Sequence, residues 1–134
     1  MKDDDEKLPE DDAAWREKLG EARFRVLRQG ETERPFTGEY VDETLAGTYR
    51  CAGCAEPLFS SEAKFDAGCG WPSFCAAVSE KVTTREDVSH GMRRVEIQCS
   101  RCGGHLGHVF EDGPAPTGLR YCVNSASLEL ERES

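Results

Sequence analysis

The spacing of the cysteines constrains this chain more than any other feature of its sequence. Two Cys-x-x-Cys pairs, Cys51/Cys54 and Cys99/Cys102, are separated by the 44 residues from 55 to 98, and a single Cys122 follows them. Four thiolates in two short-spaced pairs can complete a tetrahedral zinc site, which leaves no open position and holds a fold together without doing chemistry. The sequence therefore predicts one structural Zn²⁺ ion that ties together two distant strands.

The residues around the two pairs favour metal binding over redox chemistry. Gly53 and Gly103 lie beside the ligands and give the backbone freedom for a tight turn. The alternative is a pair of redox-active or vicinal disulfides. A thioredoxin-type motif needs a following helix to lower the pKa of its first thiol, but Pro57 follows the first pair and Gly103-Gly104 follows the second.

Charge is unevenly distributed along the chain of 134 residues, whose length fits one domain. Residues 1–14 hold seven acidic residues against two lysines, a net charge of −5 out of a total of −9. We expect residues 1–14 to be an acidic, disordered tail and residues 15–134 to form a single domain. The negative charge disfavours nucleic acid as a partner, because a phosphate backbone requires clustered Lys and Arg.

The N-terminal sequence begins with charged residues, and no apolar run is long enough to cross a bilayer. We therefore expect a cytoplasmic protein without a membrane partner, and a monomer. In a reducing compartment, paired cysteines are more often metal ligands or redox groups than structural disulfides.

The hydrophobic pattern predicts a small helical N-terminus followed by a mainly β domain. Asp11 or Asp12 can cap a helix that ends at Gly20, residues 24–27 are ambiguous between strand and helix, and residues 30–38 form a loop.

From Thr48 onward, short segments alternate with a period of two between glycine- and proline-rich turns. In residues 94–99 this alternation places Val95, Ile97 and Cys99 on one face, and the longest such run is residues 119–130. Repeated short strands with turn residues between them indicate an antiparallel, mainly β fold.

A candidate reaction centre lies on the segment 119–125. In a strand, Arg120, Cys122 and Asn124 point to the same side. The guanidinium favours the thiolate of Cys122, and the amide can hydrogen-bond beside a reacting group. Taken alone, however, a cysteine in a strand is most often a small buried hydrophobic residue.

Two of the three histidines, His105 and His108, stand three residues apart shortly before this segment. Histidine is the commonest proton donor or acceptor near neutral pH. One of them could instead bind the zinc ion, but four cysteines already saturate it. His90 has no partner motif, and we interpret it as a surface or structural aromatic residue.

A third component is the segment Gly68-Cys69-Gly70-Trp71-Pro72-Ser73-Phe74. Its aromatic residues could form an apolar wall or simply close the core. Cys69 lies between two glycines on backbone that is able to move, which a second thiol needs if it is to reach a reacted first one.

Together these segments closely resemble the methionine sulfoxide reductase B family, from about residue 34 to residue 128. The resemblance rests on four motifs: Gly68–Phe74, Cys102–Phe110, Asp112-Gly113-Pro114 and Arg120–Ser125. It implies a fold of two antiparallel sheets and the reduction of the R epimer of methionine sulfoxide in proteins or peptides, a repair of oxidative damage.

The resemblance also implies roles for single residues. Cys122 corresponds to the family's nucleophile and Cys69 to its resolving thiol, so that a Cys69–Cys122 disulfide forms and thioredoxin reduces it. Trp71 corresponds to the residue that packs on the substrate methyl group, and the other polar positions of the pocket are His105, His108, Asp112, Arg120 and Asn124. Phe110 completes the substrate-binding residues that we expect.

General chemistry agrees with these roles. As a thiolate attacks the sulfoxide sulfur, the departing oxygen must be protonated, and His108, or in second place His105, is the expected acid. Cys122 then becomes a sulfenic acid. We interpret Cys75 as a buried small residue rather than a backup resolving thiol.

Two alternatives belong to other classes. A non-catalytic zinc-ribbon-like module that binds peptides explains the zinc site but not Cys122 with its histidines. A thiol peroxidase normally carries its cysteine at a helix N-terminus, whereas Cys122 is predicted in a strand.

Overall fold

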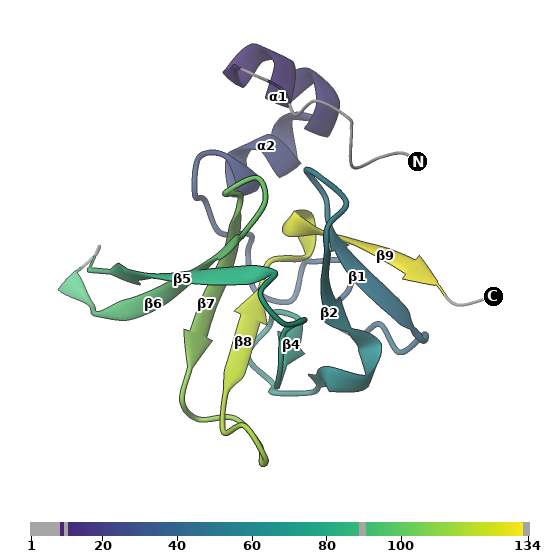
Figure 1. The fold of residues 1–134 in the computed structure, drawn as a ribbon, viewed down its shortest axis with the longest axis vertical. Coiled ribbons are helices and arrows are strands. Elements are labelled where there is room, and N and C mark those ends of the chain that lie inside the picture. The colour runs from purple at the N-terminus through teal and green to yellow at the C-terminus, as the bar shows by residue number, and fades with distance from the viewer. Residues whose placement is uncertain (1–8, 10, 89–90, 133–134) are drawn as a thin grey trace.

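Two antiparallel sheets face each other, with two short helices at one end, in the computed structural model, which describes residues 9, 11–88 and 91–132 (Figure 1). The three-stranded sheet has the order β2 (Pro57–Ser60), β1 (Gly47–Cys51), β9 (Leu128–Arg132). The six-stranded sheet has the order β3 (Lys64–Phe65), β4 (Ser73–Phe74), β8 (Arg120–Val123), β7 (His105–Phe110), β6 (Arg94–Cys99), β5 (Val82–Asp87). The predicted mainly β fold with two antiparallel sheets is confirmed.

The N-terminal helices follow the predicted signals. Helix α1 (Asp12–Leu19) is capped by the side chain of Asp11, which accepts a hydrogen bond of 2.9 Å from the backbone N–H of Ala14. It ends at Gly20, whose φ of 85° suits a residue without a side chain. Helix α2 (Glu21–Leu27) follows directly and resolves the ambiguity of residues 24–27 in favour of a helix.

Helix α1 begins inside the segment that we expected to be a tail, so residues 12–14 are helical. Our expectations for residues 1–8, residue 10 and His90 lie outside the described residues. In the described part of the chain, no helix is long and apolar enough to span a bilayer.

Aromatic side chains from both sheets form the core between them. Phe59 of β2 stacks on Phe74 of β4 with ring centroids 4.5 Å apart, and Tyr49 of β1 meets the edge of the same ring at 5.1 Å. Tyr49, Phe59 and Phe74 are fully buried. These contacts fix the position of β4 and of the neighbouring strand β8.

The alternation of residues 119–130 suggested one long strand, but the segment is not a single strand. Strand β8 ends at Val123, a 3₁₀ turn (η4, Ser125–Ser127) follows, and β9 then joins the other sheet. Where the chain leaves the six-stranded sheet, the backbone N–H groups of Ser125 and Ala126 donate hydrogen bonds to the carboxylate of Glu33.

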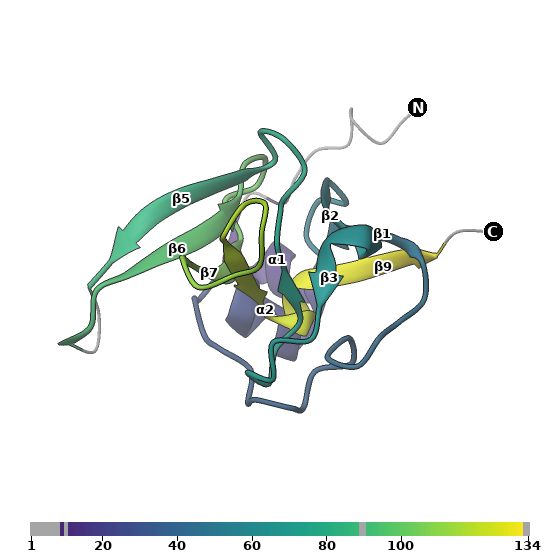
Figure 2. The same ribbon diagram turned by 90° about the horizontal axis from the view of Figure 1, so that it is seen from below.

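Strand β6 has the predicted bounds but not the predicted burial. Val95 is 40% exposed, whereas Glu96 is only 6% exposed. Hairpin β5–β6, which carries Val95, projects away from the three-stranded sheet (Figures 1 and 2). Glu96 is buried because His105 and Arg85 both hydrogen-bond to its carboxylate.

Candidate active site

A row of polar side chains crosses the six-stranded sheet on one face. The strand register pairs Glu96 with His108, His108 with Cys122, and Cys122 with Ser73. Residues directly opposite one another in an antiparallel sheet point to the same side, at Cβ distances of about 5 Å. Pairing of four strands therefore brings a thiol, an imidazole and a hydroxyl together from distant parts of the sequence.

Two thiols meet at this row. The Sγ atom of Cys69 lies 3.5 Å from the Sγ atom of Cys122 and 3.3 Å from the Oγ atom of Ser73. Cys122 comes from strand β8, and Cys69 comes from the loop before β4, where Gly68 and Gly70 have φ angles of 69° and 96°. The structure thus brings together the two cysteines for which we predicted a joint role.

The two thiols differ in acidity. Burial raises the pKa of the Cys122 thiol to about 12, and the neighbouring Cys69 adds to this effect. Arg120 lowers the pKa of Cys122, as the sequence suggested, but burial outweighs it. Burial also raises the pKa of Cys69, but hydrogen bonds with Ser73, the Trp71 backbone and Cys122, together with the charge of Arg120, hold that pKa below its ordinary value. In the resting pair, Cys69 therefore loses its proton more readily.

His108 lies in the wall of the same cavity. Its Nε2 atom is 2.9 Å from Oδ2 of Asp87, at the end of β5, and the residue is only 9% exposed. Burial lowers the pKa of His108 below its ordinary value, although the Asp87 carboxylate acts in the opposite direction. The carboxylate fixes the ring beside Cys122.

His105 lies outside that cavity. Its Nδ1 atom is 2.6 Å from Oε2 of Glu96, and its ring packs edge-on against His108 with centroids 5.7 Å apart. The pairing with Glu96 makes His105 a buried support behind His108. This difference favours His108 over His105 as the residue that meets a ligand.

The cavity has a volume of about 240 Å³. This is below the roughly 300–1,000 Å³ of pockets for drug-sized ligands, and it suits a single side chain. Seven of the residues that we predicted line it: Cys69, Trp71, His108, Phe110, Arg120, Cys122 and Asn124.

Asp112 does not line the cavity but holds one of its walls. Its carboxylate accepts two hydrogen bonds from Arg120, of 2.8 Å and 3.1 Å, and the guanidinium lies 4.4 Å from the centroid of the Phe110 ring. The Arg120 hydrogen bonds hold the pKa of Asp112 below its ordinary value. Asp112 thus orients Arg120, and Arg120 in turn lines the cavity.

Three further lining residues were not predicted: Thr32, Arg94 and Gly107. Gly107 alone carried a signal, as the glycine between the two histidines. A Cβ atom at this position would collide with the backbone carbonyl of Cys122, so glycine is needed where β7 approaches β8. Nothing local marked Thr32 or Arg94, which reach the cavity through the tertiary fold.

The four paired cysteines form a second centre. The Sγ atoms of Cys51, Cys54, Cys99 and Cys102 all lie within 4.8 Å of one another, and two of the contacts are 3.5 Å and 3.6 Å. Zinc–sulfur bonds of about 2.3 Å in a tetrahedron place sulfur atoms about 3.8 Å apart, so these thiols fit one metal ion. The cluster joins the end of β1 to the end of β6, as predicted.

The N-terminal helices cover this cysteine cluster. Arg28 stacks on Trp15 at 4.5 Å and donates a hydrogen bond of 2.9 Å to the carbonyl of Cys102. A Cβ atom on Gly53 would lie 3.2 Å from the Trp15 ring. Gly53 therefore allows close packing of Trp15, whereas of the two glycines beside the ligands only Gly103 has a positive φ angle, of 74°.

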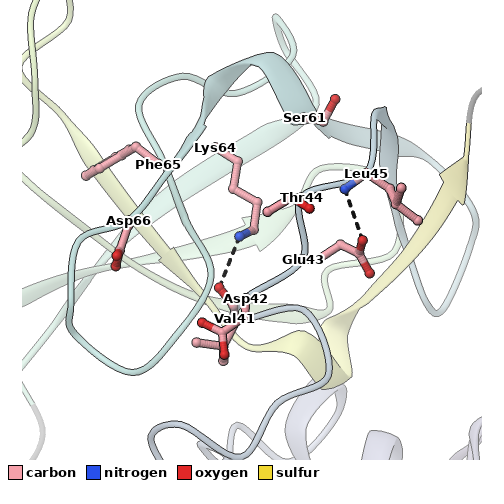
Figure 3. A pocket seen from close by; sticks show the side chains of 9 residues that line it. All are labelled: Val41, Asp42, Glu43, Thr44, Leu45, Ser61, Lys64, Phe65 and Asp66. Carbon is pink, nitrogen blue, oxygen red and sulfur yellow. Dashed lines mark hydrogen bonds between the residues drawn. The ribbon is translucent and has the colours of Figure 1, made fainter.

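Cys75 is half-buried rather than fully buried and does not line the cavity of Cys122. A larger cavity, of about 350 Å³, lies between the loop 41–45 and strand β3. Two of its polar side chains pair with backbone groups of the same cavity: Lys64 donates to the carbonyl of Val41, and Glu43 accepts from the backbone N–H of Leu45 (Figure 3). Neither a thiol nor an imidazole is among the residues that line this second cavity.

Comparison with known proteins gives a consistent result. The family model described as the SelR domain matches residues 19–132. The peptide methionine sulfoxide reductase MsrB of Bradyrhizobium diazoefficiens is 58% identical over 128 residues, which cover 95% of this chain and 92% of that protein. The protein of the same name from Teredinibacter turnerae is 61% identical over 124 residues, or 92% of each chain.

A solved structure, the Yippee-like domain of Mis18, superimposes with a TM-score of 0.54 at 17% identity. It covers 66% of this chain and 98% of that one. This likeness concerns the fold alone.

Proposed function

This chain belongs to the methionine sulfoxide reductase B family, whose members are enzymes that act on methionine sulfoxide, and on that premise we propose that it reduces the R epimer of methionine sulfoxide in peptides and proteins. One observation carries the proposal: Cys122 and Cys69 lie 3.5 Å apart, and both line a side-chain-sized cavity with Trp71 and His108. Because the members of this family are enzymes, we do not prefer the alternative of a non-catalytic module that binds peptides.

In the proposed first step, the thiolate of Cys122 attacks the sulfoxide. The S–O bond of the substrate breaks, and the oxygen accepts a proton from His108 as it moves to Cys122. The products are methionine, reduced by two electrons, and a sulfenic acid on Cys122. Trp71 and Phe110 are suited to hold the methyl end of the substrate, because both rings line the cavity.

Because burial raises the pKa of Cys122 to about 12, we propose that its thiolate forms as the substrate binds. Arg120 supports this, because its charge favours the anion. His108 supports it by accepting the thiol proton and then donating that proton to the sulfoxide oxygen.

In the second step, the thiol of Cys69 attacks the sulfenic acid sulfur. A Cys69–Cys122 disulfide forms and water leaves. An external dithiol then reduces the disulfide, and we propose thioredoxin for this role.

We further propose that the cysteine cluster holds one Zn²⁺ ion through Cys51, Cys54, Cys99 and Cys102. All four donors are thiolates and the set is complete, so the ion supplies stability and takes no part in electron transfer. The cytoplasmic location and the monomeric state stay predictions.

Incubation of the reduced protein with dabsyl-methionine-R-sulfoxide and, separately, with the S epimer tests the proposal. We expect conversion of the R epimer alone. Conversion of the S epimer, or of neither epimer by a folded, zinc-loaded protein, would contradict it.

A further inference from the structure

Glu33 lies in the loop between α2 and β1 and makes four hydrogen bonds, two with its side chain and two with its backbone. Its carboxylate accepts from the backbone N–H groups of Ser125 at 2.8 Å and Ala126 at 3.0 Å. Its backbone N–H donates to Oδ1 of Asn124 at 3.0 Å. Its carbonyl accepts from the indole Nε1 of Trp71, also at 3.0 Å.

The side-chain hydrogen bonds hold Glu33 in place, and its backbone hydrogen bonds then position two other residues. The carboxylate ties Glu33 to the turn that follows β8, 92 and 93 positions further along the chain. The backbone of Glu33, held there, then presents an acceptor to Trp71 and a donor to Asn124. Both of these residues line the cavity, whereas Glu33 itself does not.

The space around the carboxylate is closely fitted. A Cβ atom on Gly38 would collide with Oε2 of Glu33 and with the side chain of Ser125. Each carboxylate oxygen serves a different N–H group, so both acceptors are used. A glutamine here could accept only one of these bonds and would direct its NH₂ group at the other donor.

The indole N–H of Trp71, a partly buried residue, donates to the Glu33 carbonyl. This bond fixes the rotation of the ring. Asn124 is less dependent on Glu33, because its Nδ2 atom also donates to the carbonyl of Leu106 at 3.1 Å. Loss of Glu33 therefore disturbs the orientation of Trp71 more than that of Asn124.

We infer that Glu33 is a positioning residue, which sets the orientation of Trp71 toward the substrate methyl group by anchoring its own backbone with its carboxylate. This inference rests on the proposed function, because it assumes that Trp71 contacts the substrate. Glu33 touches no reacting atom.

The kinetic test compares Glu33→Gln with Glu31→Gln, a matched change at an exposed glutamate of the same loop. We expect Glu33→Gln to raise KM for the R sulfoxide about tenfold, and to lower kcat by a smaller factor. Glu31→Gln should leave both constants unchanged. If Glu33→Gln has a lower melting temperature than wild type but an unchanged KM, Glu33 only stabilises the fold. That result would overturn the inference.

A double-mutant cycle with Trp71→Phe, which keeps a ring but lacks the N–H donor, shows whether Glu33 acts through Trp71. We expect the two changes to be non-additive, so that the double variant has a KM close to that of the worse single variant. If the KM of the double variant instead rises by the product of the two single increases, the inference is contradicted. If Glu33→Gln does not fold, Glu33→Asp replaces it, with an effect of the same sign.

A readout without turnover separates this inference from the proposed function. The chain has two tryptophans, so an ¹⁵N-labelled sample gives two indole N–H resonances, and Trp71→Phe assigns them. In Glu33→Gln the Trp71 resonance should shift, and its exchange with solvent should rise about tenfold. The Trp15 resonance should not move.

An unmoved Trp71 resonance overturns the inference even if the enzyme reduces the R sulfoxide. If instead the Trp71 resonance shifts but the wild-type protein reduces neither epimer, the proposed function fails and the role of Glu33 in holding the indole stands.

Discussion

The Sγ atoms of Cys69 and Cys122 lie 3.5 Å apart, although the residues are 53 positions apart in the chain. A disulfide bond is about 2.05 Å long, so its formation requires the two sulfur atoms to approach by roughly 1.5 Å. Cys122 is held in the middle of a six-stranded sheet, whereas Cys69 lies in a loop between two glycines with positive φ. The movement therefore falls to Cys69, and the sheet can stay unchanged.

Replacement of Cys122 by serine should abolish reduction of the R sulfoxide. A serine hydroxyl at this site is far less nucleophilic, and removal of a nucleophile commonly costs a thousandfold or more, roughly 10³–10⁶ in rate. Product formation over one turnover measures this. Cys75→Ser is the matched control and should keep wild-type activity, because Cys75 is not part of the cavity. Substantial turnover by Cys122→Ser would refute its assignment as the nucleophile.

Replacement of Cys69 by serine should separate the two halves of the cycle. The variant should complete one turnover and continue with dithiothreitol, which reduces the sulfenic acid directly, but it should lose turnover with thioredoxin. The rate with each reductant, and trapping of the sulfenic acid with dimedone, check this. Full recycling by thioredoxin would show that Cys69 is dispensable, and a Cys69/Cys75 double variant would then test the second thiol.

The two histidines should respond differently to replacement by glutamine. His108→Gln should lower kcat by about 10²–10⁴, the usual contribution of a general acid. His105→Gln should lose less activity but more stability, about 1–3 kcal/mol, because it leaves the buried Glu96 carboxylate without its 2.6 Å partner. Turnover and urea unfolding of both variants test this. The reverse pattern would make His105 the acid.

Removal of the metal should destabilise the whole domain. Metal binding by such a site can contribute on the order of 10 kcal/mol to folding at neutral pH, and the cluster joins the ends of β1 and β6, which belong to different sheets. A chelator should release one zinc ion per chain, measured with a metal-sensitive dye, and should lower the melting temperature strongly. An unchanged melting temperature in the metal-free protein would count against a structural zinc.

The cysteine cluster and the strand β8 face could be predicted from sequence because their signals are local. Two residues between cysteines fix a metal knuckle, and a period of two places Arg120, Cys122 and Asn124 on one side. The cavity contains all three.

The features that sequence did not predict depend on long-range partners. Glu96 has the sequence of an exposed strand position, but His105 and Arg85 make its burial favourable. The break after Val123 is absent from the alternation of residues 119–130, and the turn there is hydrogen-bonded by Glu33, 92 positions away from Ser125. Likewise, the acidity of Cys122 follows its burial, which the neighbouring Arg120 did not reveal.

Stability should fall at alkaline pH through Tyr49. Burial raises the pKa of this phenol from 10.0 to about 12, with a further contribution from Glu43. Because the folded pKa is raised, the contribution of Tyr49 is complete below about pH 10 and is lost as the pH rises from there toward 12. Linkage of about 1.4 kcal/mol per pH unit gives a loss of up to ~3 kcal/mol.

Tyr49→Phe isolates this effect from the titration of lysines and thiols. Among the described residues, the Tyr49 hydroxyl is buried without a hydrogen-bond partner, so the variant should be at least as stable as wild type near neutral pH. Between pH 10 and 12 it should lose less unfolding free energy than wild type, by up to ~3 kcal/mol. Urea unfolding of both proteins at neutral and alkaline pH measures the difference. Equal alkaline losses would mean that the Tyr49 phenol ionises as readily in the folded protein as in the unfolded chain.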